Sequence, residues 1–248
     1  MRVPNAIIKN IFGLGDNVEE IMEKLCKSTI IKIDGIYYSL LDRESLEILS
    51  REFESFMQPW LEPRNGGVFV DIGAHIGKYA LHAAKIVGNE GKVVAIEPHP
   101  LNYQTLQRNI ELNKLENVIA LNLAAWNMDC KLKLFIGEAT ARHSTKTNWS
   151  RGWVEVDGRV TDHVLEDLSI GMVNWIKIDV EGAEYEVLCG LEETISKYKP
   201  KIVIEVFSKN VDKVKRFLKK HGYYLVGIAR MHISSFDWCV YLFCIPHF

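Results

Sequence analysis

Short apolar runs alternate with amphipathic stretches along the chain from Val68 onward. Each run is rich in Val and Ile and largely apolar on both faces, which is typical of strands that helices cover on both sides. The runs predict five strands: Val68–Ile72, Val93–Glu97, Val118–Leu123, Trp175–Asp179 and Lys201–Phe207. The stretches between and after them predict helices: Tyr79–Val87, Asn102–Asn113, Glu184–Tyr198 and Val211–His221. Repeated strand–helix units predict an α/β fold with a mostly parallel sheet and helices on both faces.

The last apolar runs predict a different kind of pairing. Tyr223–Ala229 and Cys239–Ile245 are separated by about nine residues, and a parallel crossover usually needs a dozen or more. We therefore expect these two strands to be antiparallel to each other.

The amino-terminal part of the chain does not show the same alternation. Ile30–Ile33 and Ile36–Ser39 flank Asp34-Gly35, a pattern that predicts a hairpin with a type I′ turn. Arg43–Met57 predicts a helix, and prolines and glycines then break the chain before the first core strand. Because residues 1–62 offer little apolar sequence for a core of their own, we expect them to cap a single main domain formed by residues 63–248.

Composition and charge narrow the class of protein. The 248 residues are 48% hydrophobic and 25% charged, which is a globular composition. The formal net charge of −2 provides no general attraction to nucleic acid or to an anionic membrane. No apolar run approaches the roughly 18 residues of a membrane span. The five cysteines form no C-x-x-C pair, so we expect neither disulfides nor zinc, and a cytoplasmic location.

The most informative motif lies where the first core strand meets its helix. Asp71-x-Gly73-x-x-x-Gly77 places glycines where a ligand can approach the backbone, beside a helix amino terminus, with His75 inside the loop. A dinucleotide site requires G-x-G-x-x-G around a pyrophosphate, whereas Asp71 stands in place of the first glycine. A carboxylate there would repel pyrophosphate but suits the ammonium group of S-adenosylmethionine (SAM). The motif therefore favours SAM over NAD.

A second acidic residue supports a nucleoside site. Glu97 ends the next predicted strand, where a carboxylate can accept hydrogen bonds from both ribose hydroxyls. Pro98 and His99 follow it and are expected to border the adenosine. Since dinucleotide folds use the same device, Glu97 alone does not distinguish SAM from NAD.

Four segments together resemble a known family. VFVDIGAHIGKYAL, VVAIEPHP with LNYQTLQRNIELN, WIKIDVEGAEYEVLCGL and KIVIEVF look like the FkbM family of SAM-dependent methyltransferases, over about residues 45 to 207. The resemblance implies a Rossmann-like class I methyltransferase fold with the strand order 3-2-1-4-5-7-6. It also implies methyl transfer to a hydroxyl of a sugar, a polyketide or another natural product. In this fold Asn122 and Ala124 would meet the adenine; the alternative is that they serve only packing.

The resemblance also suggests catalytic residues. The fourth strand lies beside the first in this fold, so Asp179 at its end should face the sulfonium and the acceptor, as base or anchor. Glu181 would orient the acceptor or a backbone amide. The alternative is that both carboxylates only hold the turn. The Asp-Asn pair that catechol-type enzymes use for a cation is missing from Glu205-Val-Phe-Ser208, so we expect transfer without a metal.

The acceptor is not fixed by the sequence. Gly137–Arg159 is a polar and aromatic departure from the alternation, so we expect it and the amino-terminal segment to form the acceptor side, where Trp149 and Trp153 could stack on a sugar. Base methylation of nucleic acid is disfavoured, because the usual N-P-P-Y type motif is replaced by Asp179-Val-Glu-Gly182. An RNA 2′-O-methyltransferase and a non-catalytic SAM-binding protein remain alternatives. The oligomeric state stays open.

Overall fold

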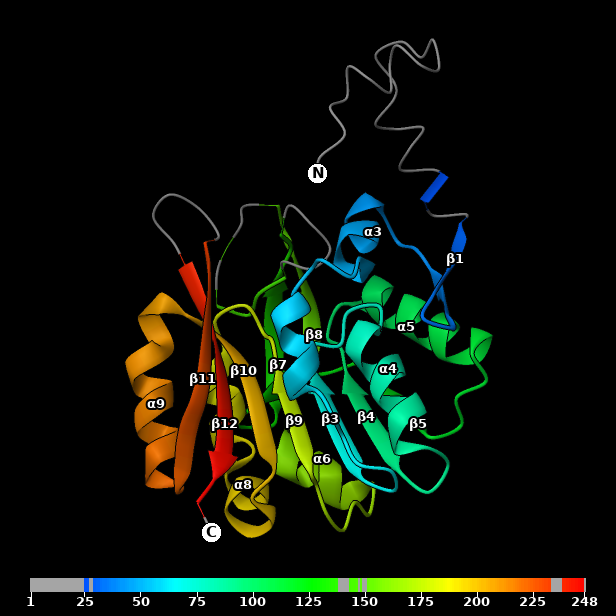
Figure 1. The fold of residues 1–248 in the computed structure, drawn as a ribbon. Helices are drawn as coiled ribbons and strands as arrows, with labels where there is room; N and C mark the ends of the chain where they lie inside the picture. The colour runs from blue at the N-terminus through cyan, green and yellow to red at the C-terminus, as the bar shows by residue number, and fades with distance from the viewer. Residues whose placement is uncertain are drawn as a thin grey trace.

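A seven-stranded sheet forms the centre of the molecule (Figure 1). The computed structural model describes residues 25–26, 29–137, 143–146, 148, 151–232 and 238–247. The strand order is β11-β12-β10-β9-β3-β4-β5, which is the predicted order read from the other edge. Neighbours from β10 to β5 pair in parallel, whereas β12 is antiparallel to both β10 and β11. The predicted α/β fold and the antiparallel final pair are confirmed.

The predicted core strands form within two residues of their expected ends. They are β3 (Val68–Ile72), β4 (Lys92–Ile96), β5 (Val118–Leu121), β9 (Trp175–Ile178) and β10 (Lys201–Phe207), followed by the longer pair β11 (Tyr223–His232) and β12 (Trp238–Pro246). Glu97 and Asp179 therefore come directly after β4 and β9. The carboxyl edge of an open parallel sheet, where these residues lie, is the usual place for a ligand.

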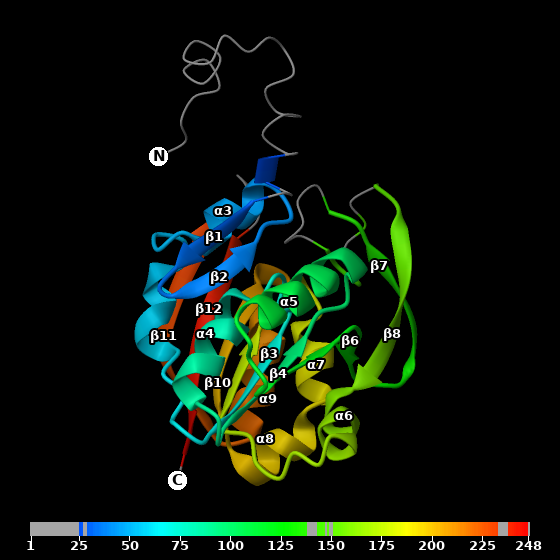
Figure 2. The same cartoon turned by 90° about the vertical axis from the view of Figure 1, so that its right-hand side faces the viewer.

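Helices cover both faces of the sheet (Figures 1 and 2). One face carries α4 (Lys78–Val87) and α5 (Pro100–Leu112), and the other carries α6 (Thr161–Asp167), α7 (Glu184–Cys189), α8 (Glu192–Tyr198) and α9 (Val211–Lys220). Each face has its own buried apolar cluster, which explains why the strands are apolar on both sides. Among the helices of the described residues, none combines the length and the apolar character needed to cross a membrane.

The single helix predicted for Glu184–Tyr198 is wrong, because the structure divides it into α7 and α8. The break falls at Gly190, which is buried. A Cβ atom on Gly190 would lie 2.0 Å from the carbonyl oxygen of Trp126. The chain therefore needs a residue without a side chain here, and the close approach of Trp126 ends the first helix.

The predicted amino-terminal hairpin is confirmed. β1 (Ile30–Ile33) and β2 (Ile36–Ser39) pair in antiparallel register. Asp34 and Gly35 have φ angles of 50° and 77°, as a type I′ turn requires. In Figure 2 the hairpin lies against α5. The boundary at residue 62 between cap and domain stays a prediction.

The helix predicted for Arg43–Met57 is wrong in its second half. It ends as α3 (Arg43–Leu49), and a separate 3-10 helix, η1 (Ser55–Trp60), follows. Glu54 between them has a φ of 52°, in the left-handed region that a helix interior does not use. Its buried carboxylate accepts hydrogen bonds from the hydroxyls of Tyr79 and Tyr241. These tertiary contacts favour the break over a continuous helix.

A second, three-stranded sheet was not predicted. It contains β6 (Ala124–Trp126), β8 (Trp153–Val160) and β7 (Cys130–Phe135), in that order. Figure 2 shows β7 and β8 standing apart from the seven-stranded sheet. The predicted departure at 137–159 therefore falls partly in a β-strand, while Trp149 lies outside the described residues.

Candidate active site

A cavity lies at the carboxyl edge of β3, β4 and β9. Seven of the ten predicted site residues line it: Gly73, His75, Glu97, Pro98, Ala124, Asp179 and Glu181. Asp71, Gly77 and Asn122 are not among its lining residues. The volume of about 220 Å³ is below the roughly 300 to 1,000 Å³ of typical ligand sites.

The glycines of the first loop are required by close packing within the protein. Gly73 and Gly77 have φ angles of 78° and 97°, and a Cβ on Gly73 would lie 1.7 Å from the carbonyl oxygen of Asp179. A Cβ on Gly77 would lie 2.4 Å from Leu81. His75 also has a positive φ, of 51°. The loop therefore folds tightly over the end of β9 and presents the backbone of Gly73 and His75 to the cavity.

Glu97 organises the next loop. Its carboxylate is buried and accepts hydrogen bonds from the backbone amides of His75 and His99, at 2.8 and 2.9 Å, and from Asn102 at 3.3 Å. Burial raises the pKa of Glu97 to about 7, although these hydrogen bonds oppose the shift. Asn122 donates to the carbonyl oxygens of Glu97 and Pro98, both at 2.9 Å. Asn122 thus supports this loop from outside the cavity.

Asp71 faces a buried lysine that the sequence interpretation overlooked. Lys177 on β9 is the register partner of Asp71, and its ammonium lies 3.3 Å from that carboxylate and 3.5 Å from Asp179. The ammonium also donates to the carbonyl oxygen of Gly73 at 3.3 Å. Burial disfavours the charge, but the two carboxylates outweigh it and raise the pKa of Lys177. Burial raises the pKa of Asp71, and Lys177 opposes this shift, so the partner of the Asp71 carboxyl lies within the protein.

The turn after β9 is held by a carboxylate that was not among the predicted site residues. Glu184 is fully buried and accepts hydrogen bonds from the Gly182 amide at 3.0 Å and from Asn210 at 2.6 Å. Glu181 has a φ of 50°, and its carbonyl oxygen accepts from Ser144. Glu184 thus helps to hold this turn, while Asp179 and Glu181 line the cavity and their roles stay predictions.

An acidic cluster lies beside Asp179 in the same cavity. Carboxylate oxygens of Glu54, Asp179 and Glu205 all lie within 4.8 Å of one another, an arrangement able to hold a metal ion. The hydroxyl of Tyr241 lies 2.6 Å from Glu54 and 3.0 Å from Glu205. Burial and the nearby Asp179 raise the pKa of Glu205 well above its usual value. A protonated Glu205 can donate to Tyr241, which in turn donates to Glu54.

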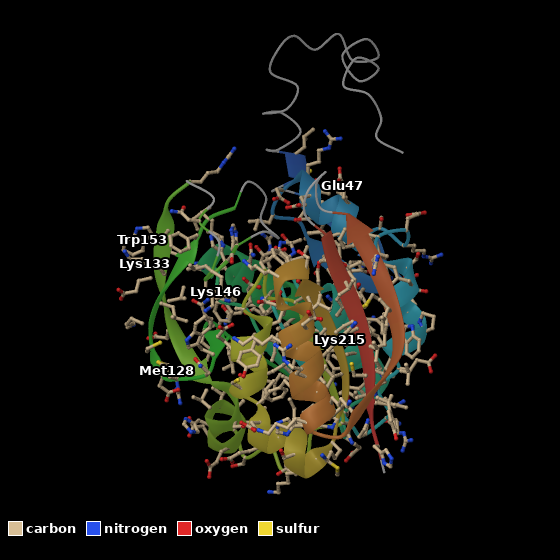
Figure 3. The ribbon with its side chains drawn as sticks, turned by 90° about the vertical axis from the view of Figure 1, so that its left-hand side faces the viewer. Glu47, Met128, Lys133, Lys146, Trp153 and Lys215 are labelled. Carbon is tan, nitrogen blue, oxygen red and sulfur yellow. The ribbon has the colours of Figure 1, made fainter. Side chains whose placement is uncertain are left out.

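Histidines form part of the wall, and the predicted aromatic contact does not. His143 stacks on His99 with ring centroids 4.0 Å apart, and burial lowers the pKa of His143 to about 3 and that of His75 to about 4. Trp153 is about half exposed and does not line the cavity. Lys133 lies over its ring, and Figure 3 shows both on the outer side of the second sheet. Its predicted stacking on an acceptor stays untested.

Sequence reasoning missed three charged groups of the site for different reasons. Lys177 and Glu205 interrupt buried apolar strands, and a charge in such a run is a usable signal because buried charges need partners. Glu54 belongs to a predicted helix, and no local pattern distinguishes it. Only the tertiary approach of the amino-terminal segment to β12 brings it into the cavity.

Comparisons with known proteins match this chain to methyltransferases. A family model described as "Methyltransferase FkbM domain" matches residues 71–225. "Methyltransferase 1" of Beauveria bassiana is 29% identical over 196 residues, which cover 70% of this chain and 78% of that protein.

Two solved structures share the fold. The FkbM methyltransferase of Methylobacillus flagellatus has a TM-score of 0.50 at 23% identity, covering 73% of this chain and only 44% of that one. The P. horikoshii TYW2 structure in complex with MeSAdo has a TM-score of 0.54 at 20% identity, covering 89% of this chain and 71% of that one. At such identities these likenesses describe architecture only.

Proposed function

This chain belongs to the FkbM family of methyltransferases, and we propose that it transfers a methyl group from SAM to a hydroxyl group of a small-molecule or glycan acceptor. S-adenosylhomocysteine (SAH) is then the second product. One observation carries the proposal: Glu97 and Asp179, from strands on either side of β3, line the same cavity. The first is suited to a ribose and the second to a sulfonium and an acceptor hydroxyl.

The residues of the cavity fit SAM. Glu97 uses three hydrogen bonds, and a carboxylate has about four acceptor positions, so it retains capacity for a ribose hydroxyl. Pro98 and Ala124 supply apolar surface beside it for an adenine. The partly exposed carboxylate of Asp179 favours a positive sulfur by simple Coulomb attraction. Asp71 does not line the cavity, so in this proposal it acts on SAM only indirectly. It pairs with Lys177, which in turn contacts the carbonyl group of Gly73.

The chemical step needs alignment and removal of one proton. When bound, SAM supplies a methyl group that its positive sulfur has already activated. Asp179 accepts the hydroxyl proton of the acceptor, and Lys177 at 3.5 Å holds that carboxylate in place. Glu181, at the start of the same turn, orients the acceptor.

We expect the reaction to need no metal ion, although the acidic cluster could offer ligands. Both carboxylate oxygens of Glu54 already accept from tyrosine hydroxyls, and Asp179 is paired with Lys177. Transfer should therefore be unchanged by EDTA. Inhibition by EDTA that added magnesium reverses would contradict this expectation.

The test of the proposal uses Asp179→Asn. Labelled SAM is mixed with excess enzyme and an organic extract of the source cells, and methyl transfer is followed in a single turnover. The variant should lose about 100-fold or more in rate, because a positioned base typically contributes 10² to 10⁴. Its affinity for SAH should stay within about threefold, since the removed proton acceptor acts in catalysis.

Asp212→Asn is the matched control, because Asp212 is exposed on α9 and lies outside the cavity. It should transfer like the unmodified protein. An Asp179→Asn rate equal to that of the control would remove Asp179 from the mechanism.

A further inference from the structure

A second cavity lies under the amino-terminal segment, beside the one described above. It holds about 710 Å³ and is bounded by the hairpin β1–β2, the segment from Leu49 to Glu62, and α4. This volume falls within the roughly 300 to 1,000 Å³ typical of sites for small organic molecules. None of the ten predicted site residues lies in it, but much of its lining belongs to the amino-terminal segment, which the sequence predicted to form the acceptor side.

The floor of the second cavity is apolar and its rim is polar. Four buried side chains form the floor: Ile36, Tyr38, Leu49 and Leu61. Exposed polar side chains stand at the rim, including Glu62, His82 and the ion pair of Asp34 with Arg51. An apolar floor with a few polar groups at the edge is the usual construction of a site for a largely apolar ligand.

The two cavities share one wall. Phe53, Glu54, Lys78 and Tyr79 line both of them. The ammonium of Lys78 donates to the carbonyl oxygen of Phe53 at 2.9 Å and lies over the Phe53 ring at 4.8 Å. Burial lowers the pKa of Lys78 to about 8. A single layer of side chains, which includes the long side chain of Lys78, therefore lies between the second cavity and Asp179 and Glu205.

We propose that the second cavity binds the apolar body of the methyl acceptor, whose hydroxyl group passes the shared wall beside Lys78 to reach Asp179 in the first cavity. This inference rests on the proposed function, and it narrows the acceptor to a molecule with an extended apolar part. A free sugar fits poorly, because its hydroxyls would lose their hydrogen bonds to water over the apolar floor. The continuity of the two cavities argues for the acceptor over an unrelated ligand.

Calorimetry with two probes tests the proposal. 2-Naphthol represents an apolar alcohol and methyl α-glucoside a polar one, and each is titrated into the full chain with and without SAH. We expect 2-naphthol to bind and the glucoside to bind at least tenfold more weakly. Ile86→Trp, at the partly exposed edge of the second cavity, should weaken 2-naphthol at least fivefold by filling the space. Its SAH affinity should stay within twofold.

Leu101→Trp is the matched control, because Leu101 is exposed on α5 and lines neither cavity. It should bind 2-naphthol within twofold of the unmodified protein. His82→Trp provides a second filled variant at an exposed rim position, should Ile86→Trp fold poorly.

Failure of 2-naphthol to bind would overturn the proposal. So would binding that neither filled variant weakens, or stronger binding of the glucoside. Loss of SAH binding by the unmodified protein would instead contradict the proposed function. The 2-naphthol titrations therefore test the acceptor cavity, and the SAH titrations test the proposed function.

Discussion

Lys177 is the buried cation of the site, and its ammonium lies close to two carboxylates. It is buried between Asp71 and Asp179 and contacts the carbonyl oxygen of Gly73. A buried charge pair contributes little net stability compared with apolar residues, but removal of one partner leaves an uncompensated charge. Lys177 therefore contacts three groups that the sequence analysis had assigned separately to ligands: Asp71 and Gly73 from the motif, and Asp179 from the resemblance.

Lys177→Met should lower the free energy of unfolding by about 3 to 5 kcal/mol, the usual cost of orphaning a buried charge. Denaturant titration measures this value. Lys215→Met, on the exposed face of α9 (Figure 3), should change stability by less than about 0.5 kcal/mol. The double variant Asp71→Asn/Lys177→Met should recover part of the loss. A cost below about 1 kcal/mol for Lys177→Met would show that the pair is not charged.

We predict that SAH binding depends on pH through the ionisation of Glu97. Its pKa is raised to about 7 by burial, and ribose hydroxyls donate to the ionised form. The affinity for SAH should therefore be about tenfold weaker at pH 6 than at pH 8. His75 and His143 have lowered pKa values of about 4 and 3 and stay neutral across this range. Glu97→Gln should bind weakly, with a flat profile in calorimetry.

The same shift has a consequence for the ligand-free protein. Because the folded pKa of Glu97 lies above its unfolded value, the folded state binds the proton more strongly. The resulting stability is fully present below about pH 4.5 and is lost as pH rises through about 7. Because SAH binds more tightly when Glu97 is ionised, SAH should raise the melting temperature more at pH 8 than at pH 6. An equal increase at both values would contradict the assignment of Glu97.

At the scale of elements, the break between α7 and α8 depends on one close approach. A Cβ on Gly190 would lie 2.0 Å from the carbonyl oxygen of Trp126 in β6. Gly190→Ala should therefore destabilise the protein by about 1 to 3 kcal/mol, the usual cost of overpacking. Gly171→Ala is the control, because its Cβ would meet nothing within 4 Å. Equal melting temperatures for the two variants would contradict this packing.

The elements that could be predicted from the sequence are those that local patterns determine. Continuous Val- and Ile-rich runs located the core strands, and Asp34-Gly35 determined the hairpin turn. The second sheet was missed although the alternation of charged and apolar residues in β7 is itself a strand signal, because β6 is only three residues long and β7 lies beside a segment that resembles a loop. Its strands are fixed by pairing with each other, which no local window contains.

For the molecule as a whole, the sequence predicted where the candidate site lies, but it predicted only some of the residues that form it. The carboxyl edge of the sheet follows from the strand order, so Glu97 and Asp179 were found from their places after β4 and β9. Glu54 and Tyr241 come from segments 187 residues apart and meet only because the amino-terminal segment packs on β12. That packing also forms the second cavity, and no sequence motif predicts this cavity.

The proposed function requires the cavity at β3, β4 and β9 to bind SAM through Glu97. Calorimetric titration of SAH into the unmodified protein, Glu97→Gln and Glu116→Gln at pH 8 tests it most directly. Glu116 is exposed and outside the cavity, so it provides the same substitution without a role in the site. We predict one SAH per chain, an affinity at least tenfold weaker in Glu97→Gln, and no change in Glu116→Gln. Absence of SAH binding by the unmodified protein, or equal affinity in all three, would contradict the account.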